Sequence, residues 1–240
     1  MSGKPKVLRV LYAARDMVFR DLFRALRQYC RGDVLDVGGW DFYLTAKQRK
    51  IGFDTWTTLE CSEGKKPQIP DEKFKFVTGD GCNMQFADNS FDTAINIHVL
   101  EHVFEPIRMV LEIGRILKKG GRAVFLIPQN SALHCVPHHY YNFTRFWIEQ
   151  VMATAGLRII ELEPLGGFWS SLAARFFHFF LQSFKYGYMS TADNRRNVFF
   201  YIFYPVMFLY ALLSIPLNLM LSFGDLREEP NSHLVVAEKN

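Results

Sequence analysis

The stretch Val34-Leu35-Asp36-Val37-Gly38-Gly39 is a short apolar run that ends at two glycines. This pattern predicts a buried β-strand that stops at a tight turn, because glycine adopts the backbone conformations that such turns need. Four later segments have the same strand-like character: residues 55–60, 74–77, 91–97 and 122–127. Residues 106–117, between the last two of these segments, show the spacing of an amphipathic helix instead.

Strands that alternate with helical segments predict an α/β fold with a parallel sheet covered by helices on both faces. Residues 143–155 are expected to form a further helix, residues 157–165 a sixth strand, and residues 234–238 a final strand. Ligands bind such sheets beyond the carboxyl ends of the strands, so the candidate site residues are sought there.

Composition excludes several classes of protein. Of the 240 residues, 49% are hydrophobic and 22% are charged, which excludes a disordered or fibrous chain. The formal net charge of +4 is too small to indicate a nucleic-acid partner. The four cysteines show no CxxC spacing, which argues against a zinc site or a disulfide framework and indicates a reducing compartment. We therefore expect no metal, and we expect no secretion because no signal-peptide core follows the N-terminus.

Residues 7–29 have helical spacing of apolar side chains, and four arginines occupy another face. These are Arg20, Arg24, Arg27 and Arg31. The arginine face is either the solvated side of a packed helix or a basic surface for anionic lipid.

The first two strand ends carry residues suited to a nucleoside-containing cofactor. Gly38 and Gly39 follow Asp36 and allow the backbone to approach a ligand closely. Glu60 ends the second strand, where a carboxylate accepts hydrogen bonds from both hydroxyls of a ribose. NAD uses a strand-end acid in the same way, although its sites depend on a wider glycine spacing for the pyrophosphate.

The third strand end carries the turn Gly79-Asp80-Gly81, in which Asp80 is placed to accept a hydrogen bond from an adenine amino group. The glycine pattern of the first turn is not GxGxxG, since Trp40 and Phe42 stand where further glycines are expected. Each strand end alone is a weak signal, but their order at successive strands makes the set more specific.

From about residue 34 to residue 128 the chain resembles the class I S-adenosylmethionine-dependent methyltransferases of the subgroup called methyltransferase type 11. The resemblance is carried by the first strand with its two glycines, by Glu60 and by Gly79-Asp80. Its most specific parts are Phe86-Ala-Asp-Asn-Ser-Phe91-Asp92, Val99-Leu100-Glu101-His102-Val103 and Ile116-Leu-Lys-Lys-Gly-Gly-Arg122.

The resemblance implies a Rossmann-like sheet whose final strand is antiparallel. It also implies S-adenosylmethionine as cofactor, held at Asp36, Gly38 and Gly39, with Glu60 on the ribose and Asp80 and Gly81 near the adenine. Asn96 to His98 would line the methyl donor. The cofactor has no phosphate to bind, and the short glycine loop therefore favours it over NAD.

Methyl transfer is an in-line displacement at the sulfonium methyl group, for which an enzyme mainly supplies proximity and orientation. An oxygen or nitrogen acceptor also needs a base to remove its proton. The run His138-His-Tyr-Tyr-Asn-Phe-Thr144 looks like a His-x-x-Tyr-x-Phe-Thr run of many type 11 proteins, or it caps the helix near Thr144. We select His138 as the base, with His98 second; the other candidates are His102, His139 and Tyr141.

Residues 166–232 are expected to be a hydrophobic helical insertion between a core of residues 1–165 and a final strand in residues 233–240. Residues 197–224 contain no charged side chain and are long enough to cross a bilayer core. Because the final strand returns to the sheet, we expect a re-entrant or in-plane segment, or a pair of segments crossing out and back. Pro205 and Pro216 favour a bent path. The alternative is a soluble helical cap over the active site or a dimer interface.

Cations flank the apolar stretch on both sides, which favours placing both ends in the cytoplasm. We therefore expect an enzyme at the cytoplasmic face of a membrane. The insertion resembles those of type 11 proteins encoded among glycan and lipid-linked sugar genes, which suggests a small or lipid-linked acceptor such as a sugar or glycolipid. The alternatives are a membrane-attached binding protein that kept the fold without catalysis, and an NAD-dependent sugar-modifying enzyme.

Overall fold

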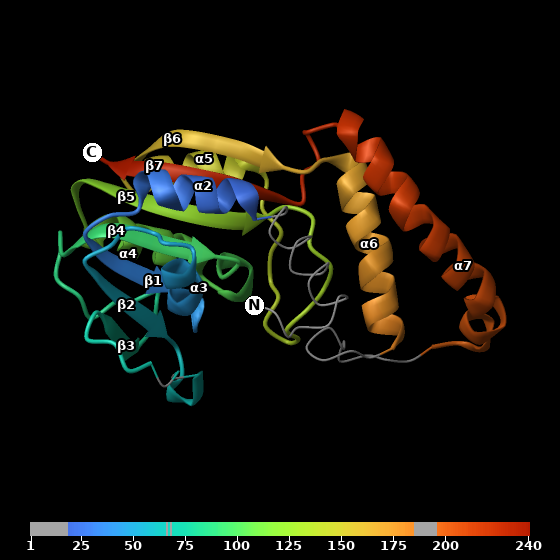
Figure 1. The fold of residues 1–240 in the computed structure, drawn as a ribbon, viewed down its shortest axis with the longest axis horizontal. Coiled ribbons are helices and arrows are strands. Elements are labelled where there is room, and N and C mark those ends of the chain that lie inside the picture. The colour runs from blue at the N-terminus through green and yellow to red at the C-terminus, as the bar shows by residue number, and fades with distance from the viewer. Residues whose placement is uncertain (1–18, 66, 68, 185–195) are drawn as a thin grey trace.

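The computed structural model describes residues 19–65, 67, 69–184 and 196–240. They form an α/β domain from one end of which two helices project (Figure 1). The strands are β1 (Asp33–Val37), β2 (Thr55–Glu60), β3 (Phe74–Thr78), β4 (Phe91–Ile97), β5 (Leu117–Pro128), β6 (Leu157–Leu165) and β7 (Ser232–Lys239). The helices are α2 (Arg20–Tyr29), α3 (Phe42–Gln48), α4 (Pro106–Ile116), α5 (Arg145–Thr154), α6 (Phe168–Ser183) and α7 (Val198–Leu221). Short 3₁₀ turns are η1 (Glu63–Lys65), η2 (Leu100–His102) and η4 (Ser222–Gly224).

The seven strands form one sheet in the order β3-β2-β1-β4-β5-β7-β6. The strands β1 to β5 are parallel to their neighbours, and β7 lies antiparallel between β5 and β6. From β1 the chain runs outward through β2 to β3 and then returns to β4 on the other side of β1. This reversal creates the usual ligand position of doubly wound sheets. The predicted Rossmann-like fold, with its antiparallel last strand, is confirmed.

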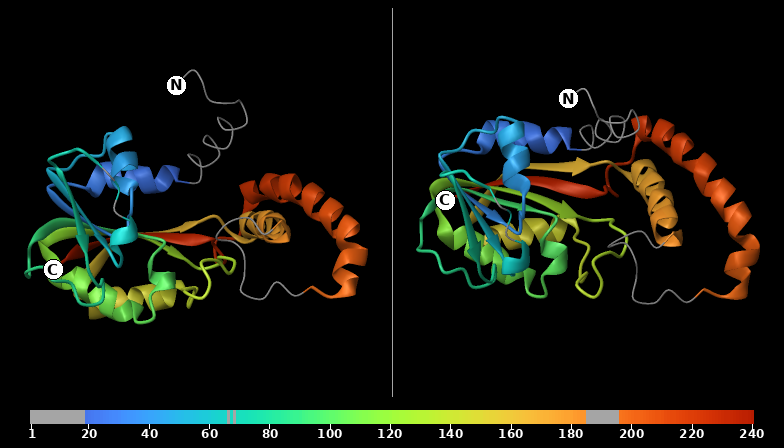
Figure 2. Two further views of the ribbon diagram at one scale, coloured as in Figure 1. Left: turned by 90° about the horizontal axis from the view of Figure 1, so that it is seen from below. Right: turned by 60° about the horizontal axis from the view of Figure 1, so that its bottom comes forward.

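Helices cover both faces of the sheet, as Figure 2 shows. One apolar cluster includes residues of α4 and α5, among them Val110, Ile113 and Ile148, and the other includes residues of α2 and α3 with Trp56 beneath them. Trp56 is fully buried and contacts the rings of Tyr43 and Phe53. Burial of these side chains is the main contribution to the stability of the domain.

The helices α6 and α7 together are called the helical hairpin below. Pro128 at the end of β5 and Leu165 at the end of β6 both pair with Ser232 at the start of β7. This register places the hairpin at the carboxyl end of the parallel strands, where Figure 1 shows it beyond the arrowhead of β5. The expected hydrophobic helical insertion before the final strand is confirmed, and residues 185–195 of it lie outside the described residues.

The structure differs from the predicted elements at a few places. β5 begins at Leu117 rather than at residue 122, because Leu117 pairs with Phe91 ahead of a register shift. α7 continues through Pro205 and Pro216, so the prolines do not interrupt the helix, and α7 curves along its length instead (Figure 1).

The helix expected over residues 7–29 is described only from Arg20 onward, and residues 7–18 lie outside the described residues. Its basic face is partly engaged within the domain, because Arg24 forms an ion pair with Glu161 of β6. This contact supports the packed-helix interpretation for that arginine.

Candidate cofactor-binding site

The turn after β1 is tightly packed around Asp36. Its carboxylate is buried, and neither oxygen has a hydrogen-bond partner within the described residues. A Cβ atom at Gly39 would lie 1.8 Å from the Asp36 Oδ2 atom, so only glycine leaves room there. Gly38 has a φ of +77° and donates its N–H to the Leu59 carbonyl oxygen at 2.8 Å. The two glycines therefore allow the turn to close over a buried acid.

Burial raises the pKa of Asp36 to about 8; the neighbouring Trp56 side chain opposes this rise, and the nearby Glu60 carboxylate adds to it. Removal from water disfavours the charged form of a carboxyl group. A buried acid without a hydrogen-bond partner is costly in a domain that serves only as a scaffold. At a strand end of this fold, such an acid indicates a position where a polar group of a ligand binds.

Glu60 lies at the end of β2 and is 4% exposed. Its Oε1 atom accepts a hydrogen bond from the Trp40 backbone N–H at 2.8 Å. Trp40 itself has a φ of +46°, a conformation that favours glycine, and its side chain is 55% exposed. The tryptophan that replaces a glycine of the usual pattern thus retains a glycine-like backbone and orients the predicted ribose-binding carboxylate.

Asp80 is exposed, and its Oδ1 atom accepts a hydrogen bond from the Cys82 N–H at 2.8 Å. Gly81 is buried, and a Cβ atom there would lie 2.4 Å from the Met109 Cε atom. The Gly79 N–H donates to the Glu60 carbonyl oxygen at 2.8 Å, which joins the third strand end to the second. The structure therefore brings the predicted ribose and adenine positions to adjacent strand ends.

Asn96 and His98 lie at the end of β4, beside β1. The Asn96 amide donates to the Val37 carbonyl oxygen at 3.4 Å, and its own buried oxygen has no partner among the described residues. His98 has a φ of +53°, and its Nδ1 atom lies 3.5 Å from Glu101 Oε1. Asn96 thus presents a second orphaned polar atom next to the Asp36 turn.

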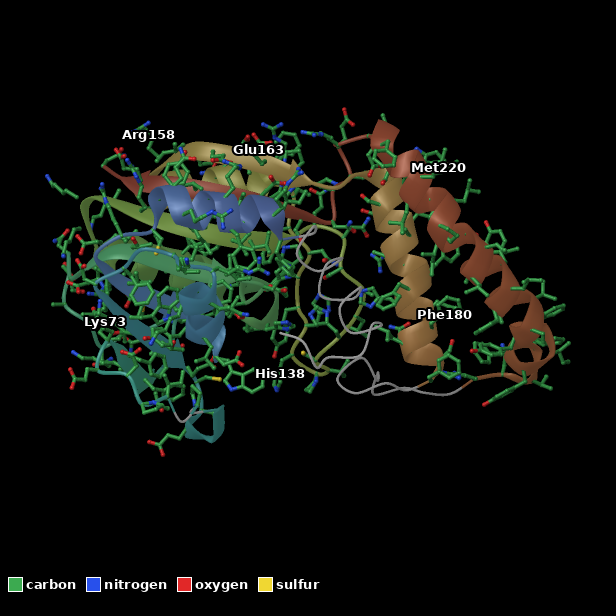
Figure 3. The ribbon with its side chains drawn as sticks, viewed as in Figure 1. Lys73, His138, Arg158, Glu163, Phe180 and Met220 are labelled. Carbon is green, nitrogen blue, oxygen red and sulfur yellow. The ribbon has the colours of Figure 1, made fainter. Side chains whose placement is uncertain are left out.

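His138 belongs to the loop that connects β5 to α5. Figure 3 shows this loop between the sheet and the hairpin. Its side chain is exposed, and its Nδ1 atom lies 3.1 Å from the Tyr140 hydroxyl. Its backbone carbonyl oxygen is in contact with the His102 ring. The expected cap is also present, because the Thr144 hydroxyl accepts from the Trp147 N–H at the start of α5. The role of His138 as a base stays a prediction.

The sequence reasoning missed His134, which the structure places beside His102 and His139. The centroid of the His134 ring lies 4.7 Å from the centroid of the His102 ring and 4.5 Å from that of the His139 ring. It also missed Glu101, whose carboxylate is fully buried below His98 and His102. No periodicity or spacing in the loop signals these contacts, which arise from the folding of two strand-end loops toward each other.

A separate cavity of about 430 Å³ lies between α5, β6 and the start of β7. It is lined by Gln129, Thr144, Arg145, Phe146, Leu162, Pro164, Arg227, Glu228 and His233. None of the predicted cofactor residues lines it, and burial and the nearby Arg145 lower the pKa of His233 within it. Its location at the base of the hairpin separates it from the strand ends of β1 and β2.

The residues present fit S-adenosylmethionine. The orphaned oxygens of Asp36 and Asn96 are acceptors for polar donors, and Gly38 and Gly39 keep the turn clear of side chains. Glu60 is held at the neighbouring strand end in the position for ribose hydroxyls. The fold and these strand ends define a nucleoside-cofactor domain of the class I methyltransferase type.

Comparison with known proteins agrees. A family model described as a methyltransferase domain, that of methyltransferase type 11, matches residues 36–125. Residues 36–125 therefore form a class I methyltransferase domain of the type 11 family, whose cofactor is S-adenosylmethionine. A demethylmenaquinone methyltransferase of Paenarthrobacter aurescens is 38% identical over 66 residues, covering 28% of this chain and 24% of that protein. The chain spans less than half the length of the curated relatives it matches.

Solved structures show the same fold over most of the chain. An S-adenosylmethionine-dependent methyltransferase from Mesorhizobium loti aligns over 92% of this chain and 98% of its own, with a TM-score of 0.55 and 14% identity. Phosphoethanolamine N-methyltransferase 2 of Haemonchus contortus, solved with S-adenosylmethionine, aligns over 93% of this chain and 55% of its own, with a TM-score of 0.56 and 15% identity.

Proposed function

We propose that this protein transfers the methyl group of S-adenosylmethionine to a small or lipid-linked acceptor, a sugar or glycolipid, at the cytoplasmic face of a membrane. The cofactor would occupy the strand-end site described above. The observation that carries the membrane part of the proposal is the inverted distribution of side chains in the helical hairpin.

The hairpin buries small and polar residues and exposes large apolar ones. The buried residues of α6 and α7 are Ser171, Ala173, Ala211, Ser214 and Asn218. Asn218 satisfies its amide within the helix by donating to the Ser214 carbonyl oxygen at 2.7 Å. Small residues at a helix interface and large apolar residues outside are characteristic of helices packed in lipid.

The exposed apolar surface of α7 is large and continuous. Between Val198 and Met220 its exposed residues include Phe199, Tyr201, Ile202, Val206, Leu209, Leu213 and Leu217, each at least 52% exposed. The segment Val198–Gly224 has a mean hydropathy of 2.1, and only 11% of its most apolar window is buried. A core helix of a soluble domain would be mostly buried, so the exposure supports a lipid environment.

The two helices differ in a way that favours insertion into one leaflet. α7 carries no charge, and its 24 residues span about 36 Å. α6 has 16 residues, about 24 Å, and carries Arg175 and His178, so it is short for a bilayer core of about 30 Å. Arg175 also donates to the Asn130 side chain of the sheet domain at 2.5 Å. We therefore propose that α7 lies in the leaflet and that α6 stays near the interface.

The position of the hairpin supports an acceptor that comes from the membrane. It projects from the end of the sheet at which the predicted cofactor residues lie. An acceptor anchored in the leaflet would therefore reach the strand-end loops without leaving the membrane surface. A base such as His138, which lies in the loop between the sheet and the hairpin, would remove the acceptor proton.

Cofactor binding is tested by calorimetric titration with S-adenosylmethionine, in wild type and in Glu60→Ala. We expect micromolar binding that is lost in the variant. Transfer of a labelled methyl group into the organic extract of membranes would then identify lipid-linked acceptors. No binding by well-folded protein would refute the proposal.

Membrane association is tested by washing isolated membranes at high salt without detergent. Embedded protein stays with the membrane, whereas a soluble cap or a charge-held protein is released. Release would refute the leaflet position. The hairpin would then be a soluble cap over the active site, or its apolar surface would contact a second copy of the chain.

A non-catalytic binding protein is the second candidate, and the altered glycine loop, with the Trp40 side chain in place of a glycine, favours it. His138→Ala distinguishes the two. The enzyme loses turnover in this variant and keeps cofactor binding, whereas the binding protein shows no turnover in either form.

A further inference from the structure

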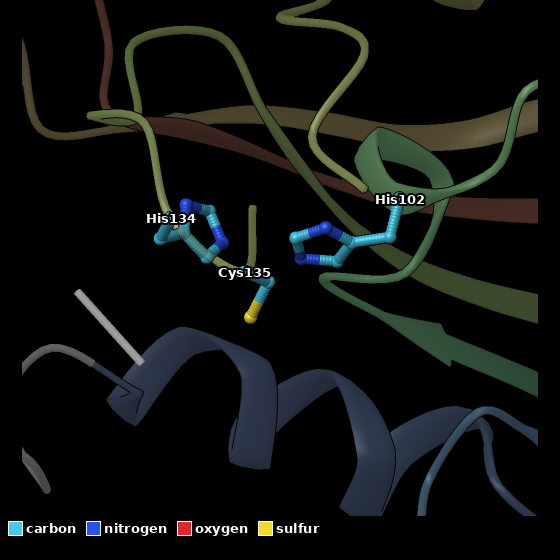
Figure 4. A group of neighbouring side chains, drawn as sticks. All are labelled: His102, His134 and Cys135. Carbon is cyan, nitrogen blue, oxygen red and sulfur yellow. The ribbon is translucent and has the colours of Figure 1, made fainter. Parts of the chain in front are cut away.

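Three potential metal ligands meet above the carboxyl ends of β4 and β5. One nitrogen of His102, one nitrogen of His134 and the Sγ atom of Cys135 lie within 4.8 Å of one another. His102 comes from η2 after β4, and the other two come from the loop after β5. Figure 4 shows the two rings on either side of Cys135.

The hydrogen bonds of the two rings determine which nitrogens are available. His102 Nδ1 contacts the His138 carbonyl oxygen, and His134 Nδ1 lies 2.8 Å from the Ala132 carbonyl oxygen. A carbonyl oxygen only accepts, so each Nδ1 carries the hydrogen and donates it. With the hydrogen on Nδ1, each ring presents a lone pair on Nε2. Metal-binding histidines are oriented in this way by a carbonyl or carboxylate on the other ring nitrogen.

His139 fixes the loop without being available as a ligand. Its Nδ1 atom accepts a hydrogen bond from the His134 N–H at 3.2 Å, and its Nε2 atom lies 3.3 Å from the Ser131 hydroxyl. Ser131 is in turn hydrogen-bonded to the Asn142 side chain at 2.8 Å. These contacts hold His134 in place before any ion arrives, which lowers the ordering cost of binding.

Glu101 provides an independent sign that a cation belongs here. Its side chain is fully buried, and neither carboxylate oxygen has a hydrogen-bond partner within the described residues. Its Oε1 atom lies 3.5 Å from His98 Nδ1 and 3.9 Å from His102 Nε2. A buried carboxylate needs a compensating charge, and a divalent cation held by His102 would supply it.

We propose that His102 Nε2, His134 Nε2 and Cys135 Sγ bind one divalent transition-metal ion of the zinc type. Two imidazoles and one thiolate match the preference of zinc for nitrogen and sulfur ligands, and three protein ligands leave a fourth tetrahedral position for an oxygen ligand. Ligand atoms around such an ion lie about 3.5 Å apart. The three ligand atoms now lie within 4.8 Å of one another, and a side-chain rotation of the exposed Cys135 would bring its Sγ atom to the shorter distance. Binding of the ion does not depend on the proposed function.

Cobalt(II) titration of tag-free, full-length protein under reducing conditions tests the site, because cobalt replaces zinc and absorbs light. We expect one equivalent to bind, with a sulfur-to-cobalt band in the near ultraviolet and tetrahedral bands in the visible. Zinc(II) should displace it. Cys135→Ser should abolish the sulfur band, and His134→Ala should weaken binding at least tenfold.

Two matched variants serve as controls, and circular dichroism checks the folding of every protein. Cys61→Ser removes another exposed cysteine, and His138→Ala removes a histidine of the same loop that contributes only its backbone. Both should bind cobalt as wild type does. A wild-type protein without a sulfur band, or a band that survives in Cys135→Ser, would overturn the proposal.

Discussion

Residues 123–127 of β5 and the helix α7 are both strongly apolar, but the strand buries its large side chains whereas the helix exposes them. Residues 123–127 of β5 are at most 2% exposed, because helices and neighbouring strands cover them on both faces. In α7 the large side chains point outward, and only Ala211, Ser214 and Asn218 are buried. Hydrophobicity alone therefore does not distinguish a buried core strand from a helix with an exposed apolar surface. The two elements are distinguished by which residues they bury: β5 buries its large apolar residues, and α7 buries its small and polar ones.

The largest expected effect comes from comparing a buried ring of the sheet domain with an exposed ring of α7. Trp56→Ala removes a fully buried ring of the sheet domain and should lower the free energy of unfolding by about 3–5 kcal/mol. Phe203→Ala removes a ring of α7 that is 54% exposed and should change it by less than about 0.5 kcal/mol. Urea unfolding in detergent micelles measures both. Equal losses would mean that Phe203 is covered, and the contrast would fail.

A charge on the hairpin should break membrane association while sparing the domain. Leu213 is 63% exposed, and Leu213→Asp places a carboxylate where lipid is expected, at a cost of about 2.5–3.5 kcal/mol. Partition into vesicles should fall about 100-fold in a flotation assay. Ile107→Asp is the matched control, because Ile107 is an apolar residue of α4 that is 48% exposed on the sheet domain. A similar loss in both variants would contradict a lipid-specific role of α7.

Close packing around Asp36 should make the cofactor site sensitive to a single methyl group. Gly39→Ala puts a Cβ atom against the Asp36 carboxylate, and overpacking of this kind costs about 1–3 kcal/mol. Affinity for S-adenosylmethionine should fall about tenfold or more by calorimetry. Gly52→Ala adds the same atom in open space and should leave the affinity unchanged. Wild-type affinity in Gly39→Ala would show that the turn is not part of the site.

The smallest expected effect, counted per pH unit, concerns the buried polar residues of the two regions. Burial raises the pKa of Asp36 from an unfolded value of about 4 to about 8, so the folded protein retains a proton that the unfolded chain loses. Stability should therefore fall as the pH rises from about 4 to about 8, by at most about 1.4 kcal/mol per pH unit. Asp36→Asn should remove this slope in pH-dependent urea unfolding. Asn218→Ala in the hairpin should retain it, since Asn218 does not titrate; an unchanged slope in Asp36→Asn would contradict the buried acid.

The strands were predictable because a buried parallel strand is a short apolar run bounded by turn residues. β2, β4 and β6 begin and end at the predicted residues. The start of β5 was not predictable, because Lys118 and Gly120 lack the composition of a strand and join the sheet through pairing with β4. Tertiary pairing overrides local preference at this place.

The strand-end residues were predictable from their order along the chain, because every parallel strand brings its carboxyl end to the same edge. Asp36, Glu60 and Asn96 accordingly meet at one edge, and their assignment to the cofactor stays a prediction. The cluster of His102, His134 and Cys135 could not be found in this way. Two of its members lie in an irregular loop, and the spacing rules for metal ligands apply to residues that are neighbours in the sequence.

The position of β7 between β5 and β6 sets an order of events during synthesis. β6 leaves the ribosome before the hairpin, and β7 leaves after it, so β6 has no strand beside it in the sheet until the hairpin has emerged. Long-range strand pairing is a slow step in folding. If the hairpin enters a bilayer as proposed, it would do so while the sheet is still incomplete, and the domain would close only afterwards. Anchoring of the protein and completion of its sheet would then be successive stages of one process.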